Sequence, residues 1–261
     1  MSFLRRVIND LKKYREYMIF CIKSSIKLQV AGTNLGYFWW ILDPLFFMFV
    51  YTVFVLVIRG KTNPEFPIFI FCALVPWKWT ATSISGSADS IAKKRGILEQ
   101  IYIPKFIFPL MDVVINLSKF IFGIVVLLVL LPLFKINFSF HIFEAIVVVI
   151  VQGVFLIGLS LIIAHLGIYF RDIRNILQFA IQLWFYMSPG IYTLEYIPEK
   201  YRFLWWFNPM TTFFYSYRNT FMYNCPPLYL NLFIILIISL ILVIIGLIII
   251  YKSDKNYTKV V

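Results

Sequence analysis

The stretch that decides the fold is LYLNLFIILIISLILVIIGLIIIY at Leu228–Tyr251, which contains no charged residue. A helix needs about 20 mostly apolar residues to cross the roughly 30 Å hydrocarbon layer of a membrane. Three further runs are equally clear, and two more are interrupted by proline or polar residues. The six predicted spans are Tyr37–Ile58, Phe66–Ala88, Leu110–Phe134, Ile142–Gly167, Ile176–Leu194 and Leu228–Tyr251. The pattern predicts an all-α integral membrane protein with six transmembrane helices.

The composition excludes a soluble protein. Hydrophobic residues make up 61% of the 261 residues and charged residues 14%, whereas a soluble domain is about 45–50% apolar and about a quarter charged. Three widely separated cysteines and two histidines predict neither a disulfide framework nor a metal site. We expect one transmembrane domain over residues 1–261, with an interfacial segment at 1–36, the bundle at 37–251 and a tail at 252–261.

The distribution of basic residues predicts the orientation. Six spans place both termini on one side, and sixteen Lys and Arg then fall in segments on that side, against six on the other. Cytoplasmic loops carry an excess of Lys and Arg, so both termini are predicted to be cytoplasmic. This topology explains the net charge of +12, and nucleic acid is not an expected partner.

Residues 3–22 precede the first span and are too polar to cross. Their apolar and basic residues fall on opposite faces of a helix, which is the pattern of a helix lying in the membrane interface. Two interpretations stay open. The helix is either a simple anchor, or its surroundings attract an anionic lipid headgroup that belongs to the cargo. The cations that would do so are Lys12, Lys13, Lys23 and Lys27.

The cytoplasmic loop after the second span has an apolar stripe without a partner. Gly96 is expected to end the preceding helix, and a short amphipathic helix then follows up to Pro104. Its stripe would dock into another protein, or pack on the membrane surface. The stripe consists of Ile97, Leu98, Ile101 and Tyr102, with Glu99 between them.

The segment Glu195–Cys225, predicted to lie outside, is unusually aromatic, with twelve aromatic residues among 31. Asn208-Pro209 has the cap-then-proline pattern of a helix start, so we expect two short helices that dip into the outer leaflet. Aromatic residues suit a membrane interface, and their flat faces also suit the apolar faces of sugar rings.

Polar residues inside the predicted spans are the remaining candidates. Lys78 lies between Trp77 and Trp79 and either lines a polar path or extends its amine to the interface. Asp43 precedes Pro44, which we attribute to a helix kink, and Lys119 lies on the face of Asp112, with which it could pair. No catalytic motif is present. RGKT at 59–62 lacks the first glycine of a phosphate-binding loop, so the chain is not expected to be an enzyme.

Six strings, in order along the chain, carry a family resemblance. They are NLGYFWWILDPLFFMFVY at 34–51, PWKW at 76–79, IPKFIFPL at 103–110, YFRDIRN at 169–175, MSPGIY at 187–192 and FNPMTTFFYSYRN at 207–219. Together they resemble the membrane subunits of bacterial polysaccharide-exporting ATP-binding-cassette (ABC) transporters, which export O-antigen, capsule and wall teichoic acid precursors.

The resemblance implies a homodimer in the bacterial cytoplasmic membrane, bound to two copies of a cytosolic ATPase. ATP and Mg would be held by that ATPase, with no cofactor on this chain. The substrate would be a polyprenyl-diphosphate-linked glycan. Residues 97–103 would be the coupling helix, and Arg171 would lie near the inner mouth together with the lysines of residues 12–27.

The resemblance also suggests a channel between protomers with aromatic walls. The channel candidates are Trp39, Phe46, Tyr51, Trp77, Lys78, Trp184, Tyr186 and Tyr192, and the outer-gate candidates are Trp205, Trp206, Asn208 and Pro209. Lys78 is a charge where the family pattern would have an apolar or aromatic residue, which indicates an anionic polymer or no special role. The alternatives are an ABC permease for a drug or small lipid, an ATP-independent flippase or carrier, and a membrane transferase.

Overall fold

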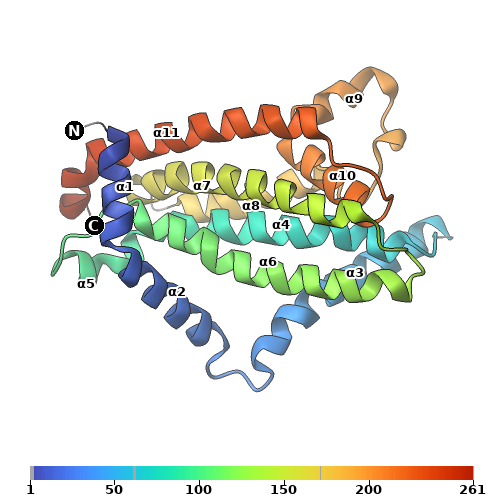
Figure 1. Cartoon of the computed structure of the whole chain (residues 1–261), viewed down its shortest axis with the longest axis horizontal. Coiled ribbons are helices and arrows are strands. Elements are labelled where there is room, and N and C mark those ends of the chain that lie inside the picture. The colour runs from blue at the N-terminus through green and yellow to red at the C-terminus, as the bar shows by residue number, and fades with distance from the viewer. Residues whose placement is uncertain (1–2, 61–62, 171, 261) are drawn as a thin grey trace.

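The computed structural model describes residues 3–60, 63–170 and 172–260, and every regular element among them is a helix (Figure 1). The α-helices are α1 (Phe3–Lys13), α2 (Arg15–Val30), α3 (Trp39–Arg59), α4 (Phe66–Ala88), α5 (Arg95–Leu98), α6 (Ile107–Leu133), α7 (Ala145–Tyr169), α8 (Ile173–Tyr186), α9 (Glu199–Trp206), α10 (Pro209–Phe221) and α11 (Tyr229–Val260). Short 3-10 turns lie at Gly36–Phe38, Ala92–Lys94, Phe140–Glu144 and Leu194–Tyr196.

Five helical stretches of the described chain are long and apolar enough to cross a membrane. They are Gly36–Ile58, Phe66–Ala88, Ile107–Leu133, Phe140–Tyr169 and Tyr229–Asp254. They match five of the six predicted spans. At the remaining one, Ile176–Leu194, α8 has 14 residues and ends at Tyr186, after which the chain turns at Ser188–Gly190.

Helix α4 is the centre of the bundle. It is the most buried of the five long helices, and it packs against α3, α6, α7, α8 and α10. Its apolar residues therefore form the main core, whereas Lys78 lies on the side where α4 meets α3. The most extensive helix contact joins α7 and α11. A side chain on Gly158 would lie 2.8 Å from Cβ of Leu242, so glycine there permits the close approach.

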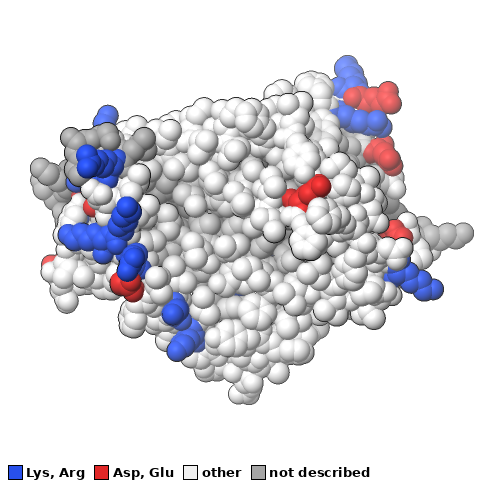
Figure 2. All heavy atoms as spheres, in the orientation of Figure 1, with Lys and Arg blue, Asp and Glu red and all other residues white. Residues whose placement is uncertain are grey.

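The ends of the chain lie at the same end of the elongated body, here called the terminal end (Figure 1). The opposite end, with α9 and α10, is called the far end. Figure 2 shows Lys and Arg concentrated at the terminal end, with a smaller group at the far end. This arrangement agrees with an excess of basic residues on the side of the termini.

The predicted amphipathic helix 3–22 is divided in the structure. It breaks at Tyr14 into α1 and α2, and α1 lies across the terminal end of the bundle (Figure 1). The break follows from contacts with protein: Val7 is buried, the ring of Phe3 packs on that of Tyr251, and the Tyr14 hydroxyl donates to the carbonyl of Tyr102 at 2.8 Å. The apolar face of α1 thus packs partly on the bundle itself.

The expected helix 97–103 is also shorter than predicted. Helix α4 ends at Ala88 rather than near Gly96, which lies inside the four-residue α5. Beyond Leu98 the chain loses its helical form because Ile103 is buried in the core and Lys105 is drawn to Asp254.

The far end carries two short helices within the aromatic segment, α9 and α10; that they dip into the outer leaflet stays a prediction. The side chain of Asn208 accepts a hydrogen bond from the backbone N–H of Met210 at 3.0 Å, so it caps the start of α10 ahead of Pro209. Helix α10 is buried along most of its length, between α4 and α7. Helix α9 is largely exposed.

Candidate functional site: a charged cavity along α4

A cavity of about 590 Å³, here called the central cavity, lies inside the bundle. It is bounded by α3, α4, α6 and α8. Indole and phenyl rings form much of its wall, and Asp43, Lys78 and Lys119 supply its charges. A charged group at membrane depth is costly unless it is paired or reaches water, so these charges mark the cavity as a candidate site.

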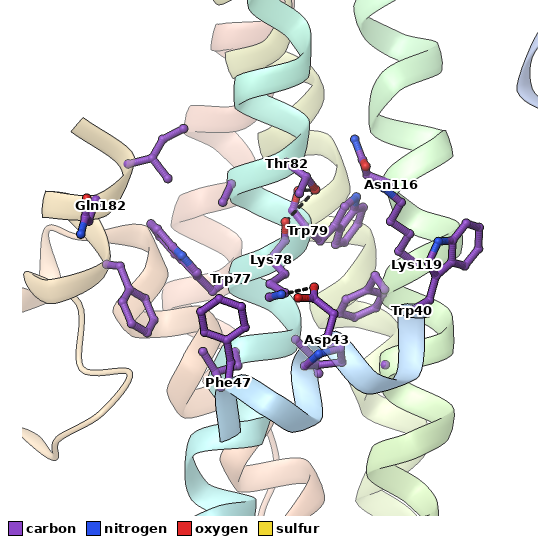
Figure 3. A pocket seen from close by; sticks show the side chains of 18 of the residues that line it. Trp40, Asp43, Phe47, Trp77, Lys78, Trp79, Thr82, Asn116, Lys119 and Gln182 are labelled. Carbon is purple, nitrogen blue, oxygen red and sulfur yellow. Dashed lines mark hydrogen bonds and ion pairs between the residues drawn. The ribbon is translucent and has the colours of Figure 1, made fainter. Parts of the chain in front are cut away.

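Lys78 and Asp43 form an ion pair in this cavity. Figure 3 shows the two side chains directed at each other from α4 and α3. The amine of Lys78 also lies 4.2 Å from the ring centroid of Phe47, a distance suited to a cation–π contact. The Asp43 side chain is 52% exposed and that of Lys78 26%. The carboxylate is thus the accessible partner of the pair.

Lys119 faces the same cavity from α6. Its amine lies 5.9 Å from the ring centroid of Trp40, and Figure 3 shows the two side chains next to each other. Among the described residues Lys119 makes no ion pair. Asn116 lies one turn before it and donates to the carbonyl of Asp112. The expected pairing of Lys119 with Asp112 is therefore wrong, because the amine turns to the ring of Trp40.

A second cavity of about 610 Å³, here called the inner cavity, lies on the side of the terminal end. Both cavities are lined by Thr82, Asn116, Lys119 and Gln178, so they adjoin. The inner cavity adds Lys93, Lys94 and Asp112, with hydroxyl and amide groups from α2 and α4. A polar path therefore follows α4 from its end at Ala88 to the level of Lys78.

The structure brings five of the eight channel candidates into the central cavity. These are Trp39, Tyr51, Trp77, Lys78 and Tyr186. Phe46 lies outside it and is 55% exposed. Trp184 packs edge-on against Trp77, with ring centroids 5.6 Å apart. Tyr192 lines a separate cavity of about 420 Å³ near the far end. Whether these rings contact a substrate stays a prediction.

The outer-gate candidates are tied to the channel candidates by hydrogen bonds. The indole N–H of Trp184 donates to Asn208 Oδ1 at 2.9 Å, and the Asn208 amide donates to Ser188 Oγ at 2.8 Å. The indole N–H of Trp205 donates to the Tyr192 hydroxyl at 2.8 Å. Trp206 packs on the ring of Tyr215. The start of α10 is thus fastened to the end of α8.

A buried arginine holds the turn that ends α8. Arg218 on α10 is 1% exposed, and its guanidinium donates to the carbonyls of Pro189 at 2.7 Å, Gly190 at 2.6 Å and Phe69 at 3.2 Å. It also stacks on the ring of Phe69, 3.4 Å from the centroid. Backbone oxygens and a ring therefore stabilise this cation.

The predicted docking stripe is only partly exposed. Ile97 and Leu98 pack on the second core cluster, whereas Ile101 and Tyr102 are 53% and 55% exposed and Glu99 is exposed. The Tyr102 hydroxyl donates to Asp254 at 2.9 Å, and burial together with this hydrogen bond raises the pKa of Tyr102 to about 12. Asp254 also pairs with the buried Lys105 at 3.0 Å. This segment is anchored to the end of α11.

The predicted headgroup cations lie on exposed surface. Lys12 and Lys13 end α1, and Lys23 and Lys27 are one turn apart on α2. Arg171 lies outside the described residues. The neighbouring Arg174 pairs with Asp89 at 3.2 Å. The structure does not gather these four lysines around one cavity.

Sequence reasoning missed three functional candidates: the role of Asp43, the exposure of Lys119 to the cavity, and the burial of Arg218. Opposite charges in two predicted spans could have suggested the Asp43–Lys78 pair. No sequence signal distinguishes Arg218 from the other basic residues of the far end, because its partners are backbone carbonyls.

Comparisons with known proteins agree on one family. The family profile described as ABC-2 type transporter matches residues 16–222. The chain is 31% identical over 218 residues to the O-antigen export system permease protein RfbA of Myxococcus xanthus, covering 83% of this chain and 84% of that protein. It is 28% and 29% identical to two proteins of the same name from Klebsiella pneumoniae, over 94% of this chain and 95% of each.

Proposed function

This chain belongs to the ABC-2 type transporter family, and from that premise we propose that it is the membrane subunit of an ATP-driven polysaccharide exporter. Its cargo is a polyprenyl-diphosphate-linked glycan that crosses the cytoplasmic membrane. The observation that carries the proposal is the polar, aromatic-walled cavity along α4, in a chain similar over most of its length to O-antigen export permeases.

The proposed arrangement has two copies of this chain and two copies of a separate cytosolic ATPase, which binds ATP and Mg. The terminal end faces the cytoplasm. Helix α8 is the sixth crossing, completed by residues 187–194, since its 14 residues extend about 21 Å. Both chain ends at the same end of the bundle support an even number of crossings (Figure 1).

The central cavity is proposed to line the channel at the face shared by the two copies. Rings such as Trp77 and Tyr51 offer flat apolar contact that suits successive sugar units without one fixed hydrogen-bond pattern. Such contacts let a long glycan slide. The hydrogen-bonded cluster of Trp184, Ser188 and Asn208 would act at the outer gate, because it joins α8 to α10.

The ATPase is proposed to dock at residues 97–103. Ile101 and the ring of Tyr102 are both more than half exposed there. The Tyr102 hydroxyl and Lys105 connect the segment to Asp254 of α11. Closure of the ATPase pair would push this segment and move the bundle through those contacts.

Co-purification tests the coupling. We expect the tagged chain, extracted gently from its host, to retain an ATPase subunit in equal amount, and Ile101→Asp to lose it. Ile101 is more than half exposed, so its replacement leaves the fold intact. The matched control is Phe207→Asp, which also replaces an exposed apolar residue but at the far end, and it should keep the ATPase. If the Ile101→Asp variant still retained the ATPase subunit, the docking surface would have to lie elsewhere.

Depletion in the host tests the transport function. When synthesis of the chain is stopped, we expect a surface glycan to disappear and its lipid-diphosphate-linked form to accumulate inside the cell. Extraction of polyprenyl-diphosphate glycans and chromatography would measure this. A depleted cell with an unchanged surface glycan and no accumulation would refute the proposed function.

A further inference from the structure

The adjoining inner and central cavities contain more positive than negative charge. Four lysines line them, Lys78, Lys93, Lys94 and Lys119, together with two aspartates, Asp43 and Asp112. Neutral sugars do not need a surplus of cations, and cations in a low-dielectric environment are costly without a counter-charge. Lys93 and Lys94 belong to the basic segment after α4, whose charge the topology already explains. The charge left to be explained by what enters is that of Lys119, which lies inside the bundle and has no ion pair within the described chain.

The lysines are spread along the path rather than gathered at one point. Lys93 and Lys94 line the inner cavity, Lys119 lines both cavities, and Lys78 lines the central cavity. Lys78 stands ten residues before the end of α4 at Ala88, which is about 15 Å along the helix axis. A single diphosphate is too short to contact the amines at both ends of this series.

Their pairing leaves charge available for a ligand. Lys78 pairs with Asp43 and Lys93 with Asp89 at 3.4 Å, while Lys94 and Lys119 have no ion pair within the described chain. Asp43 is about half exposed. A negative group that arrives in the cavity can replace it beside Lys78 without first unfolding any part of the bundle.

We infer that the two cavities form an anion path, and that the glycan handled by this chain bears repeated negative charges, phosphate or carboxylate, along its length. Asp43 holds Lys78 as a counter-ion while the path is empty, and the charged groups of the glycan then pass from Lys93 and Lys94 to Lys119 and Lys78. The inference rests on the proposed function, since it assigns the substrate class of the same cavity.

Binding to the purified full chain in detergent tests the path. Trp39, Trp40 and Trp77 line the central cavity, so tryptophan fluorescence reports on occupancy. The probes are a hyaluronan hexasaccharide with carboxylates, a glycerol-phosphate hexamer with phosphates, inorganic pyrophosphate as a headgroup mimic, and uncharged maltohexaose. We expect at least one of the two anionic chains to bind more tightly than maltohexaose, and the tighter one identifies the anion.

The substitutions are expected to change the affinity for the anionic chain in opposite directions. Lys78→Gln and Lys119→Gln should each weaken binding of the anionic chain about tenfold, because each removes one charge-assisted contact. Asp43→Asn should tighten it, because the competing counter-ion is lost. If the ion pair were purely structural, both Lys78→Gln and Asp43→Asn would weaken binding of the anionic chain. Lys78→Arg should keep the binding, and the exposed Lys200→Gln at the far end is the control.

Two results would overturn the inference. One is binding of maltohexaose as tight as that of both anionic chains. The other is a dependence on Lys78 that appears with pyrophosphate alone, since the lysines would then serve the lipid headgroup.

The glycan that accumulates on depletion separates this inference from the proposed function. A glycan retained by an anion-exchange column after mild acid has removed the lipid diphosphate supports the inference. An uncharged glycan refutes the inference and leaves the exporter standing. If no glycan accumulates, the proposed function fails, and with it the substrate assigned here.

Discussion

Replacing Arg218 by methionine tests how the end of α8 is held. The guanidinium is buried and donates to the carbonyls of Phe69, Pro189 and Gly190. Methionine fills a similar volume without any donor. The replacement therefore leaves three carbonyl oxygens without this partner and removes the cation from the ring of Phe69.

The magnitude follows from these contacts. Hydrogen bonds from a charged donor contribute about 1.5–3 kcal/mol each, and a desolvated cation–π contact adds about 2 kcal/mol. Removing a buried charge returns several kcal/mol of desolvation cost. The free energy of unfolding should fall by about 3 kcal/mol, which corresponds to a drop in Tm of roughly 10 °C for a chain of this size.

The Arg218→Lys variant separates geometry from charge. Lysine keeps the charge, but its compact ammonium lacks the planar fork that reaches Pro189 and Gly190 together. It should be at least as destabilising as methionine. Thermal unfolding in one detergent, with surface glycan measured in cells, checks both variants. The control is Lys200→Met on α9, an exposed cation that lies 5.6 Å from the ring centroid of Tyr201, and it should change stability by less than about 1 kcal/mol. An unchanged Tm in Arg218→Met, or a Tm restored by lysine at this position, would refute the role of Arg218 in holding the turn that ends α8.

Three further outcomes are expected. Gly167→Ala should prevent stable folding, because the new methyl would overlap the carbonyl oxygen of Ala88. Gly96→Ala should be nearly neutral, because the space around Gly96 is open. The yield of monodisperse protein measures both effects. Asn208→Ala should lower stability by about 1–2 kcal/mol in thermal unfolding, since it removes the cap of α10 and the partner of Trp184; an effect no larger than that of Asn34→Ala in the exposed loop would contradict this role. The pKa of Tyr102, raised from 10.0 to about 12, favours the neutral phenol in the folded state. Its contribution to stability is thus present below about pH 10 and is lost as pH rises through about 12, and Tyr102→Phe should flatten that part of the alkaline unfolding curve; an unaltered curve would assign the loss to other groups.

The apolar runs predicted most of the fold because span length and charge bias are local properties of the chain. The end of α8 could not be predicted in this way. Its turn at Ser188–Gly190 depends on Arg218, whose bonds to Pro189 and Gly190 cross 29 and 28 residues of sequence. The break at Tyr14 has the same origin, since its hydroxyl bonds to Tyr102, 88 residues away.

The candidate site was predictable only in part. Trp77 and Lys78 stood out because charges and indoles in an apolar run are unusual. The partner of Lys78 required the register of two helices, as Asp43 lies 35 residues earlier. Proline at position 44 offered a sufficient local explanation for Asp43, and this concealed its electrostatic role.

The contacts of α1 also impose an order on biosynthesis. The hydroxyl of Tyr251 donates to Asp10 at 2.6 Å across 241 residues, and the ring of Tyr251 also packs on Phe3. A ribosome releases Asp10 long before it reaches Tyr251, so α1 has to wait while the whole bundle is inserted. An amphipathic helix can spend that interval on the lipid surface. The docking of α1 on α11 then occurs as one of the last steps and marks a completed bundle.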